Sequence, residues 1–142
     1  MNSGVSYTAL EPGSEERFVS LRRALGVTTF GINQIILRPG QRGRIHRHTA
    51  QEEVYLVLEG TLTLELGPDE ARELGRYELA RVAPDVRRRL VNRHPERAVL
   101  LALGGAAAHD GRDGVAWADW DEPGEGRAPQ DVPLPPDEPV GR

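Results

Sequence analysis

Residues 40–60, GQRGRIHRHTAQEEVYLVLEG, decide how the rest of the chain is interpreted. His46 and His48 stand two residues apart, and EEVYLVLEG then alternates as a β-strand does. Side chains at i and i+2 of a strand leave the same face about 7 Å apart, so the two imidazoles can converge on one ion. A carboxylate from Glu52 or Glu53 would complete a two-histidine, one-carboxylate metal set. The alternative is that the histidines are solvated or hydrogen-bonded residues of a polar strand.

Short runs with the same alternation recur between Phe18 and Gly104, broken at intervals by glycine, proline or aspartate. This spacing predicts an all-β protein of short antiparallel strands, arranged as a sandwich or a small barrel. Residues 15–25 could form either a short helix or an edge strand, and the sequence pattern does not decide between the two. The predicted strands lie within residues 27–40, 52–60, 61–66, 76–82, 87–92 and 97–105, with a hairpin turn at Gly60 and a turn at Pro84-Asp85.

Composition excludes several classes of function. The chain has 142 residues, enough for one domain, and no cysteine, which excludes disulfides, thiolate metal sites and cysteine nucleophiles. Acidic residues and arginines balance before residue 121, so no basic surface for nucleic acid is predicted. The N-terminus lacks the pattern of a signal peptide, and no apolar run approaches the roughly 20 residues of a membrane span. We expect a soluble cytoplasmic protein with no nucleic-acid or membrane partner.

Three segments are predicted along the chain: an N-terminal arm (1–17), a β domain (18–120) and a proline-rich acidic tail (121–142). The tail has no aromatic residue and carries the whole net charge of −4, so we expect a solvated polyproline-like segment rather than a docking peptide. Trp117 and Trp120 need burial, and we expect them to fasten the C-terminal arm to the domain or to a second subunit rather than to line a pocket.

The histidine stretch resembles the first motif of the cupin superfamily: a glycine, five residues, His-x-His, three or four residues, a glutamate, six residues and a glycine. Gly40, His46, His48, Glu53 and Gly60 match it without a gap, and the count back from the last glycine selects the second glutamate of the pair. The resemblance implies a small jelly-roll β-barrel with its site inside, often as a homodimer. We therefore expect a cupin barrel and a homodimer.

The second cupin motif, in residues 75–92, GRYELARVAPDVRRRLVN, departs from the metal-binding pattern. Counting back from Asn92 puts Arg88 where the last metal histidine should be, and Asp85 where the turn glycine should be. Arginine cannot be deprotonated to bind a metal, so three of four expected ligands remain. His94 lies about 20 Å along the strand from position 88, and His109 lies in a loop, so neither is expected to substitute.

Strand alternation turns Arg88, Leu90 and Asn92 inward, and leaves three possibilities for the arginine. It could repel a metal, since a unit charge about 5 Å away costs roughly 3 kcal/mol at an effective dielectric near 20. It could pair with Glu53 and leave a metal-free pocket, or it could clamp a bound anion beside a metal. Arg42 and Arg44 share the parity of the histidines and could give the barrel a positive mouth.

The predicted function is binding of a small polar or anionic molecule inside the barrel. One form has a divalent metal (Fe, Mn, Ni or Zn) held by His46, His48 and Glu53, which could support catalysis. The alternative is a metal-free binding or sensing pocket with an Arg88–Glu53 pair, no cofactor and no catalysis. The sequence leaves open whether the protein is an enzyme. The predicted pocket residues are Arg88, Tyr55, Arg44 and Asn92.

Overall fold

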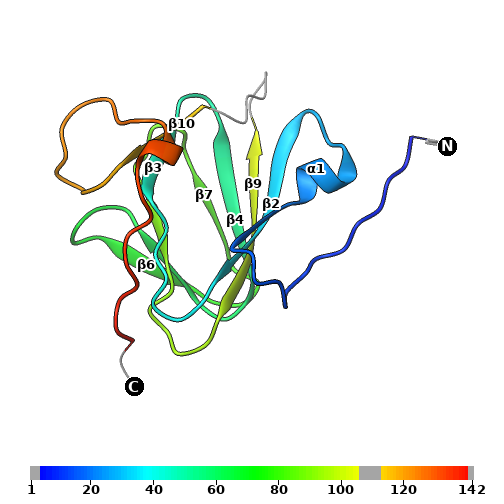
Figure 1. Ribbon diagram of the computed structural model, residues 1–142, viewed down its shortest axis with the longest axis horizontal. Helices are drawn as coiled ribbons and strands as arrows, with labels where there is room; N and C mark the ends of the chain where they lie inside the picture. Colours follow the sequence, from blue (N-terminus) through cyan, green and yellow to red (C-terminus); the bar gives the residue numbers. More distant parts are fainter. Residues whose placement is uncertain (1–3, 106–112, 141–142) are drawn as a thin grey trace.

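The computed structural model describes residues 4–105 and 113–140 as two antiparallel sheets that face each other (Figure 1). The first sheet has the strand order β1-β2-β9-β4-β7. The second is built from the pair β10-β3 and the group β6-β5-β8, which isolated bridges between Arg42 and Val91 and between His46 and Arg88 connect. The prediction of an all-β antiparallel fold is confirmed, and among the described residues no helix is long and apolar enough to cross a membrane.

A strand occurs within each of the six predicted ranges, whereas the strand Ala71–Leu74 was not predicted. They are β1 (Phe18–Ser20), α1 (Leu21–Leu25), β2 (Phe30–Leu37), β3 (Ile45–His48), β4 (Glu52–Glu59), β5 (Leu62–Glu65), β6 (Ala71–Leu74), β7 (Leu79–Val82), β8 (Arg89–Val91), β9 (Ala98–Gly105), β10 (Gly114–Trp117) and the 3-10 turn η1 (Pro129–Asp131).

The apolar core lies between the two sheets. Inward-facing residues of β2, β4 and β9 pack against those of β5 and β8, with Tyr55, Val57 and Leu100 all at most 1% exposed. Burying a large aliphatic or aromatic side chain stabilises the folded state by about 1.5 to 3 kcal/mol. The apolar residues that alternate along the predicted strands are therefore the residues that form this core.

The turn after β4 needs the glycine that the sequence places there. Gly60 has φ of 75°, and a Cβ atom at this position would lie 2.2 Å from the carbonyl oxygen of Arg97. Such a φ is unfavourable for residues that carry a Cβ atom. The predicted turn at Gly60 is present, but the predicted hairpin is wrong: β4 pairs with β7 and β9, and β5 pairs with β6 and β8, so this turn carries the chain from the first sheet to the second.

The segment 15–25 contains both of the alternatives left open, a short edge strand followed by a single helical turn. Residues of β1 pair with β2, Phe18 opposite Ile35, and α1 begins immediately afterwards. The Ser20 side chain caps the helix by accepting a hydrogen bond from the Arg23 amide at 3.1 Å. N-terminal to β1, residues 4–12 run along the outside of the molecule, with Tyr7 87% exposed (Figure 1). Ser6 Oγ donates to the Leu25 carbonyl at 2.6 Å, and the Glu11 amide donates to the Gln34 side chain at 2.6 Å.

The C-terminal region differs from the sequence prediction in two respects. Residues 114–117 form β10, a strand that was not predicted, and pair with β3. Trp117, 1% exposed, anchors the following loop by donating from Nε1 to the Gly124 carbonyl at 3.2 Å, as predicted, but contrary to the prediction Trp117 and Trp120 also line a cavity of about 310 Å³. Beyond this loop the proline-rich segment is not simply solvated, because Val132 is buried and Arg42 forms an ion pair with Glu138 at 3.0 Å.

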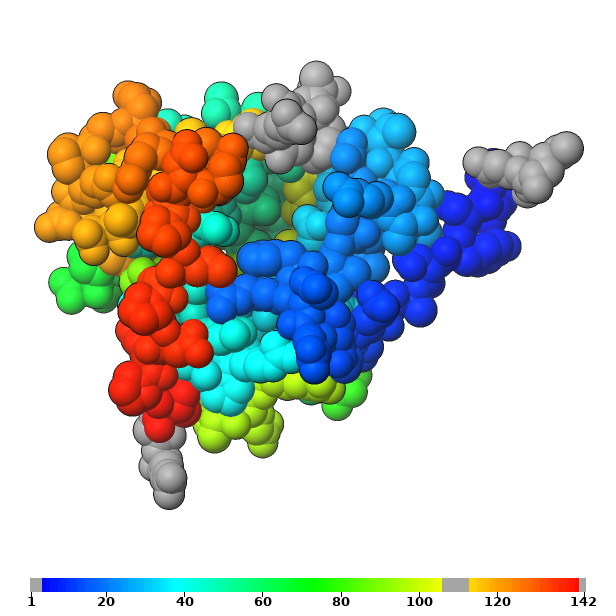
Figure 2. Space-filling view, viewed as in Figure 1, coloured from blue at the N-terminus to red at the C-terminus, as the bar shows by residue number. Residues whose placement is uncertain are grey.

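We call residues 128–140 the C-terminal strap. It runs along the β3 side of the molecule, where it appears in orange and red in Figures 1 and 2. The Gly40 backbone, with φ of 83°, approaches it so closely that a Cβ atom there would lie 2.2 Å from the Glu138 carbonyl oxygen. The strap thus rests directly on the turn that precedes β3.

Candidate functional site

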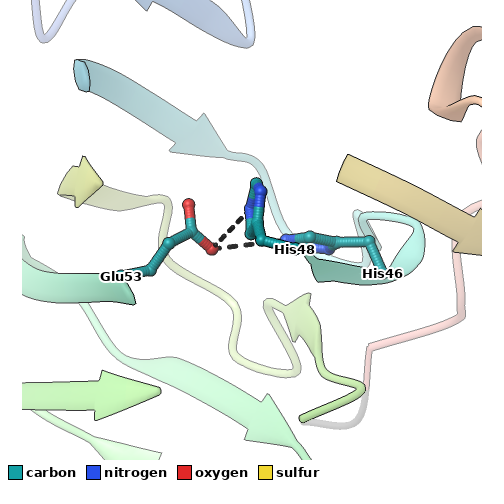
Figure 3. Close-up of side chains that lie close together, drawn as sticks. All are labelled: His46, His48 and Glu53. Atoms are coloured by element: carbon teal, nitrogen blue, oxygen red, sulfur yellow. Dashed lines mark ion pairs between the residues drawn. The ribbon is translucent and has the colours of Figure 1, made fainter. Parts of the chain in front are cut away.

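Two consecutive strands, one from each of the facing sheets, bring the predicted metal-ligand residues together (Figure 3). His46 and His48 leave the same face of β3, with ring centroids 5.4 Å apart, and Glu53 points toward them from β4. Their Nε2 atoms lie 3.5 Å and 3.2 Å from the same carboxylate oxygen, Glu53 Oε1. The possible ligand atoms of the three residues all lie within 4.8 Å of one another. This group could hold a divalent metal ion.

Glu52, the neighbouring glutamate that the motif spacing rejected, lies outside this group. It is exposed and forms an ion pair with Arg81 on β7. Because successive strand residues face opposite sides, only one of the two glutamates can reach the histidines. The sequence prediction of Glu53 therefore agrees with the position of its side chain.

Arg88 turns inward and contacts Glu53 directly. Its NH2 group donates to Oε1 at 2.7 Å, and its NH1 group donates to the Val86 carbonyl at 2.6 Å. Further carbonyls, of Ala83 and Pro84, lie 3.3 Å from NH1. The contact with Glu53 uses one nitrogen and one oxygen rather than a two-bond fork. The guanidinium has no exposed surface and lies behind the carboxylate, so it cannot itself clamp a ligand in the cavity.

The environment of Glu53 keeps its carboxylate ionised. Burial alone would raise the pKa of Glu53, but contacts with His46 and His48 outweigh it and lower the pKa well below its usual range. The Tyr55 hydroxyl also donates to Oε1. Burial and the adjacent Glu53 charge raise the pKa of Tyr55, so the phenol stays protonated and serves as a donor. Tyr55 was predicted in the pocket, and its ring lines the cavity beside Glu53.

Asp113 fixes the orientation of His48, and the sequence analysis missed it. Its Oδ1 lies 2.8 Å from His48 Nδ1, while Oδ2 accepts from the Ala50 and Gln51 amides at 2.8 Å each. Burial would raise the pKa of Asp113, yet these backbone donors and His48 lower it. Only the position of Asp113 directly before β10 could have signalled it, and β10 itself was not predicted.

The other ring nitrogen of His48, Nε2, differs from Nδ1 in its hydrogen bonding. Nε2 is buried and, among residues 4–105 and 113–140, makes no hydrogen bond, although it lies 3.2 Å from Glu53 Oε1. Burial lowers the pKa of His48, but Glu53 and then Asp113 raise it more, so the net shift is upward. A buried nitrogen without a partner is costly, and a metal ion or a ligand donor would satisfy it.

A cavity of about 700 Å³ opens in front of these residues. Figure 2 shows the hollow between the strap and the β1–α1 segment. Its walls come from both sheets and from η1, and the polar lining residues besides the histidines and Glu53 are Asn33, Arg44 and Gln130. Asn33 could have been predicted, because it is a polar residue on the inward parity of β2, beside Ile35.

The remaining predicted residues lie in different places. Arg44 lines the cavity as expected, and its Nε donates to the Val132 carbonyl at 2.6 Å. Asn92 does not reach the cavity. It is fully buried and holds the chain by donating to the Leu37 and Glu96 carbonyls, so it shapes a turn instead of a pocket. His94 pairs with Glu73 on β6, away from the site, and His109 lies outside the described residues.

Comparison with known families identifies the fold. Residues 33–104, half of the chain, match the family model for the Cupin domain. The protein is a cupin. Among solved structures, a cupin protein from Bacteroides fragilis covers 87% of this chain and 99% of its own, with a TM-score of 0.65 and 19% identity. At that identity the likeness concerns the fold alone. No curated protein matches the cupin chain.

Two structures of higher identity carry names that refer to an activity. A sugar phosphate isomerase of the cupin superfamily from Silicibacter pomeroyi is 29% identical, with a TM-score of 0.57, over 63% of this chain and 59% of its own. A structure from Acidithiobacillus ferrooxidans, whose sugar phosphate isomerase activity is provisional, is 26% identical, with a TM-score of 0.56, over 62% and 57%. The cupin chain thus spans less than three fifths of the length of each.

Proposed function

We propose that this cupin binds a small anionic molecule of the sugar-phosphate class in the 700 Å³ cavity. One observation carries the proposal: the unpaired charge that faces the cavity is positive. Arg44 uses only Nε internally, and its two terminal nitrogens make no hydrogen bond with the described residues. The carboxylates of the site are instead already bound, Glu53 by Arg88 and Asp113 by two backbone amides.

The size and polarity of the cavity suit such a ligand. Ligand pockets of about 300 to 1,000 Å³ hold small molecules, and a few fixed polar groups give them specificity. Asn33, His46 and Gln130 could hydrogen-bond to hydroxyl groups, while Arg44 would meet the phosphate. The names of the two structures above 25% identity support the same class of ligand.

The proposal is tested by isothermal titration of the full chain with fructose 6-phosphate and with fructose. We expect the phosphorylated sugar to bind more tightly, because a hydrogen bond to a charged group contributes about 1.5 to 3 kcal/mol. Arg44→Ala should weaken its binding by about 10- to 100-fold. Arg47→Ala is the matched control, since Arg47 lies on the opposite face of β3 and contacts Glu125. Equal affinities for both sugars, or no binding of either, would contradict the proposal.

Binding of a divalent metal is the second candidate function, and the buried Nε2 of His48, which makes no hydrogen bond with the described residues, favours it. His46, His48 and Glu53 would hold the ion, and a bound metal would supply Lewis-acid polarisation of a substrate carbonyl. The donor types and their spacing fit a metal. Arg88 opposes it, because the guanidinium neutralises the only carboxylate of the set and donates to the oxygen nearest the histidines.

Elemental analysis tests the second candidate. Untagged protein is purified without chelators, beside a His46→Ala control, and each sample is measured before and after exposure to excess iron, manganese, nickel or zinc. Near-stoichiometric metal that is lost in the control would favour the metal site. No retained metal in either sample would leave the three residues as ligand-binding groups of a metal-free pocket.

A further inference from the structure

The C-terminal strap is attached to the segment that precedes β3 by several contacts. Arg42 donates from Nε and NH2 to the Pro136 carbonyl at 3.2 Å each, and its NH1 group pairs with Glu138 at 3.0 Å. The Glu138 amide donates to the Gly40 carbonyl at 2.9 Å. Val132, nearer the start of the strap, is 1% exposed. The strap is therefore fastened at its far end and buried near its beginning.

The same strap reaches the ligand cavity. Its first three residues, Ala128, Pro129 and Gln130, form part of the cavity wall. Two residues later the Val132 carbonyl accepts the hydrogen bond from Arg44 Nε at 2.6 Å. A second cavity of about 310 Å³ lies beneath the strap, and Arg44 lines both cavities. Arg44 is thus positioned between the β3 segment and the strap.

This contact leaves Arg44 suited to an anion. A free arginine carries about 2 kcal/mol of side-chain entropy, part of which ligand binding would have to remove. Because the strap already holds Nε, the two terminal nitrogens can meet an anion at a lower entropic cost. Arg17 lies close enough to sense both charges of this region: burial lowers the pKa of Arg17, Asp137 of the strap raises it, and the charges of Arg44 and Arg38 lower it.

We propose that the C-terminal strap is a positioning element of the ligand site, which holds Arg44 ready for the anionic group of the ligand and closes one side of the cavity with Gln130. This inference rests on the proposed function. Under this proposal the proline-rich tail increases the affinity for the ligand as well as packing on the domain. It does so by holding Arg44 in place.

The first test deletes residues 133–142, which removes Pro136 and Glu138 but keeps the cavity-lining residues of the strap. Affinity is measured by titration with inorganic phosphate and with fructose 6-phosphate. We expect at least tenfold weaker binding of both probes. Should the shortened chain fail to fold, Arg42→Ala in the full chain breaks the same fastening, and Arg47→Ala serves as its control.

A double-mutant cycle separates positioning from general stabilisation. If the strap acts through Arg44, the deletion should weaken phosphate binding in the wild-type background and change it less than twofold in an Arg44→Ala background. An unchanged affinity after deletion, or an equal loss in both backgrounds, would overturn the inference while leaving the proposed function intact. Wild-type protein that binds neither probe would overturn both.

Discussion

Arg88 and Arg89 are neighbours in the chain, yet each meets a different glutamate on a different side of the second sheet. Arg88 points inward and pairs with Glu53, with no exposed surface of its own. Arg89 points outward and donates from Nε to Glu65 at 2.8 Å. Both glutamates are largely buried, with 14% and 7% of their side chains exposed. The two pairs have the same chemistry and differ in their surroundings.

The two ion pairs differ in the alternative partners, including water, that are available to each charge. Glu65 has a second arginine, Arg93, at 2.5 Å, and this side chain is 48% exposed to water. Arg88 has no other carboxylate within reach among the described residues, only Tyr55 and loop carbonyls. A fully buried charge that loses its partner is far more costly than an exposed one. Removing one partner of the inner pair should therefore be much more destabilising than removing one partner of the outer pair.

Removal of the two carboxylates should give the largest contrast. Glu53→Gln leaves the Arg88 guanidinium buried without a counter-charge, and we expect it to lower the free energy of unfolding by about 3 to 5 kcal/mol. Glu65→Gln, the matched change on the outer face, should cost about 1 kcal/mol because the Arg93 side chain is 48% exposed to water and Arg89 is not fully buried, in contrast to Arg88. Urea denaturation of both variants measures this. Equal losses would mean that the two pairs are energetically alike.

Replacing Arg88 or Arg89 by histidine should affect metal affinity differently at the two positions. Arg88→His supplies a fourth possible ligand and removes a like-charge repulsion of roughly 3 kcal/mol per unit of metal charge at about 5 Å. We expect tighter zinc or nickel binding by at least about tenfold, equal to about 1.4 kcal/mol. Arg89→His should change nothing. Equilibrium dialysis decides, and no gain in the first variant would show that position 88 does not occupy the fourth-ligand place.

The smallest effect is expected from the auxiliary donor of each glutamate. Tyr55→Phe removes one hydrogen bond to Glu53 Oε1 and should lower the free energy of unfolding by about 1 kcal/mol. Arg93→Ala should remain within about 0.5 kcal/mol, because Arg89 stays bonded to Glu65. Thermal denaturation of both variants, followed by circular dichroism, gives the two values. A larger loss for Arg93→Ala would reverse the ranking of the two pairs.

Strand periodicity was enough to predict which side each arginine takes. The same rule put His46 and His48 on one face, and the motif spacing then separated Glu53 from Glu52. These features depend on neighbours a few residues apart, where alternation fixes the direction of a side chain. Periodicity also predicted an all-β protein, whereas the cupin fold was predicted from the resemblance of residues 40–60 to the first cupin motif.

Contacts between distant segments were not predictable. Asp113 reaches His48 across 65 positions of the sequence, and Val132 reaches Arg44 across 88. Asn92 has the inward parity of a pocket residue. Its side-chain amide instead donates to the Leu37 and Glu96 carbonyls, whose positions depend on the folded structure. Each of these contacts depends on where a loop ends in space, which a periodic pattern does not encode.

Gly40 has a consequence beyond its own turn. Because the Glu138 carbonyl occupies the place that a Cβ atom would need, even alanine at position 40 is incompatible with the seated strap. The first glycine of the histidine motif therefore has two roles in this chain: its positive φ forms the turn before β3, and its missing side chain leaves room for the C-terminus to dock on that turn.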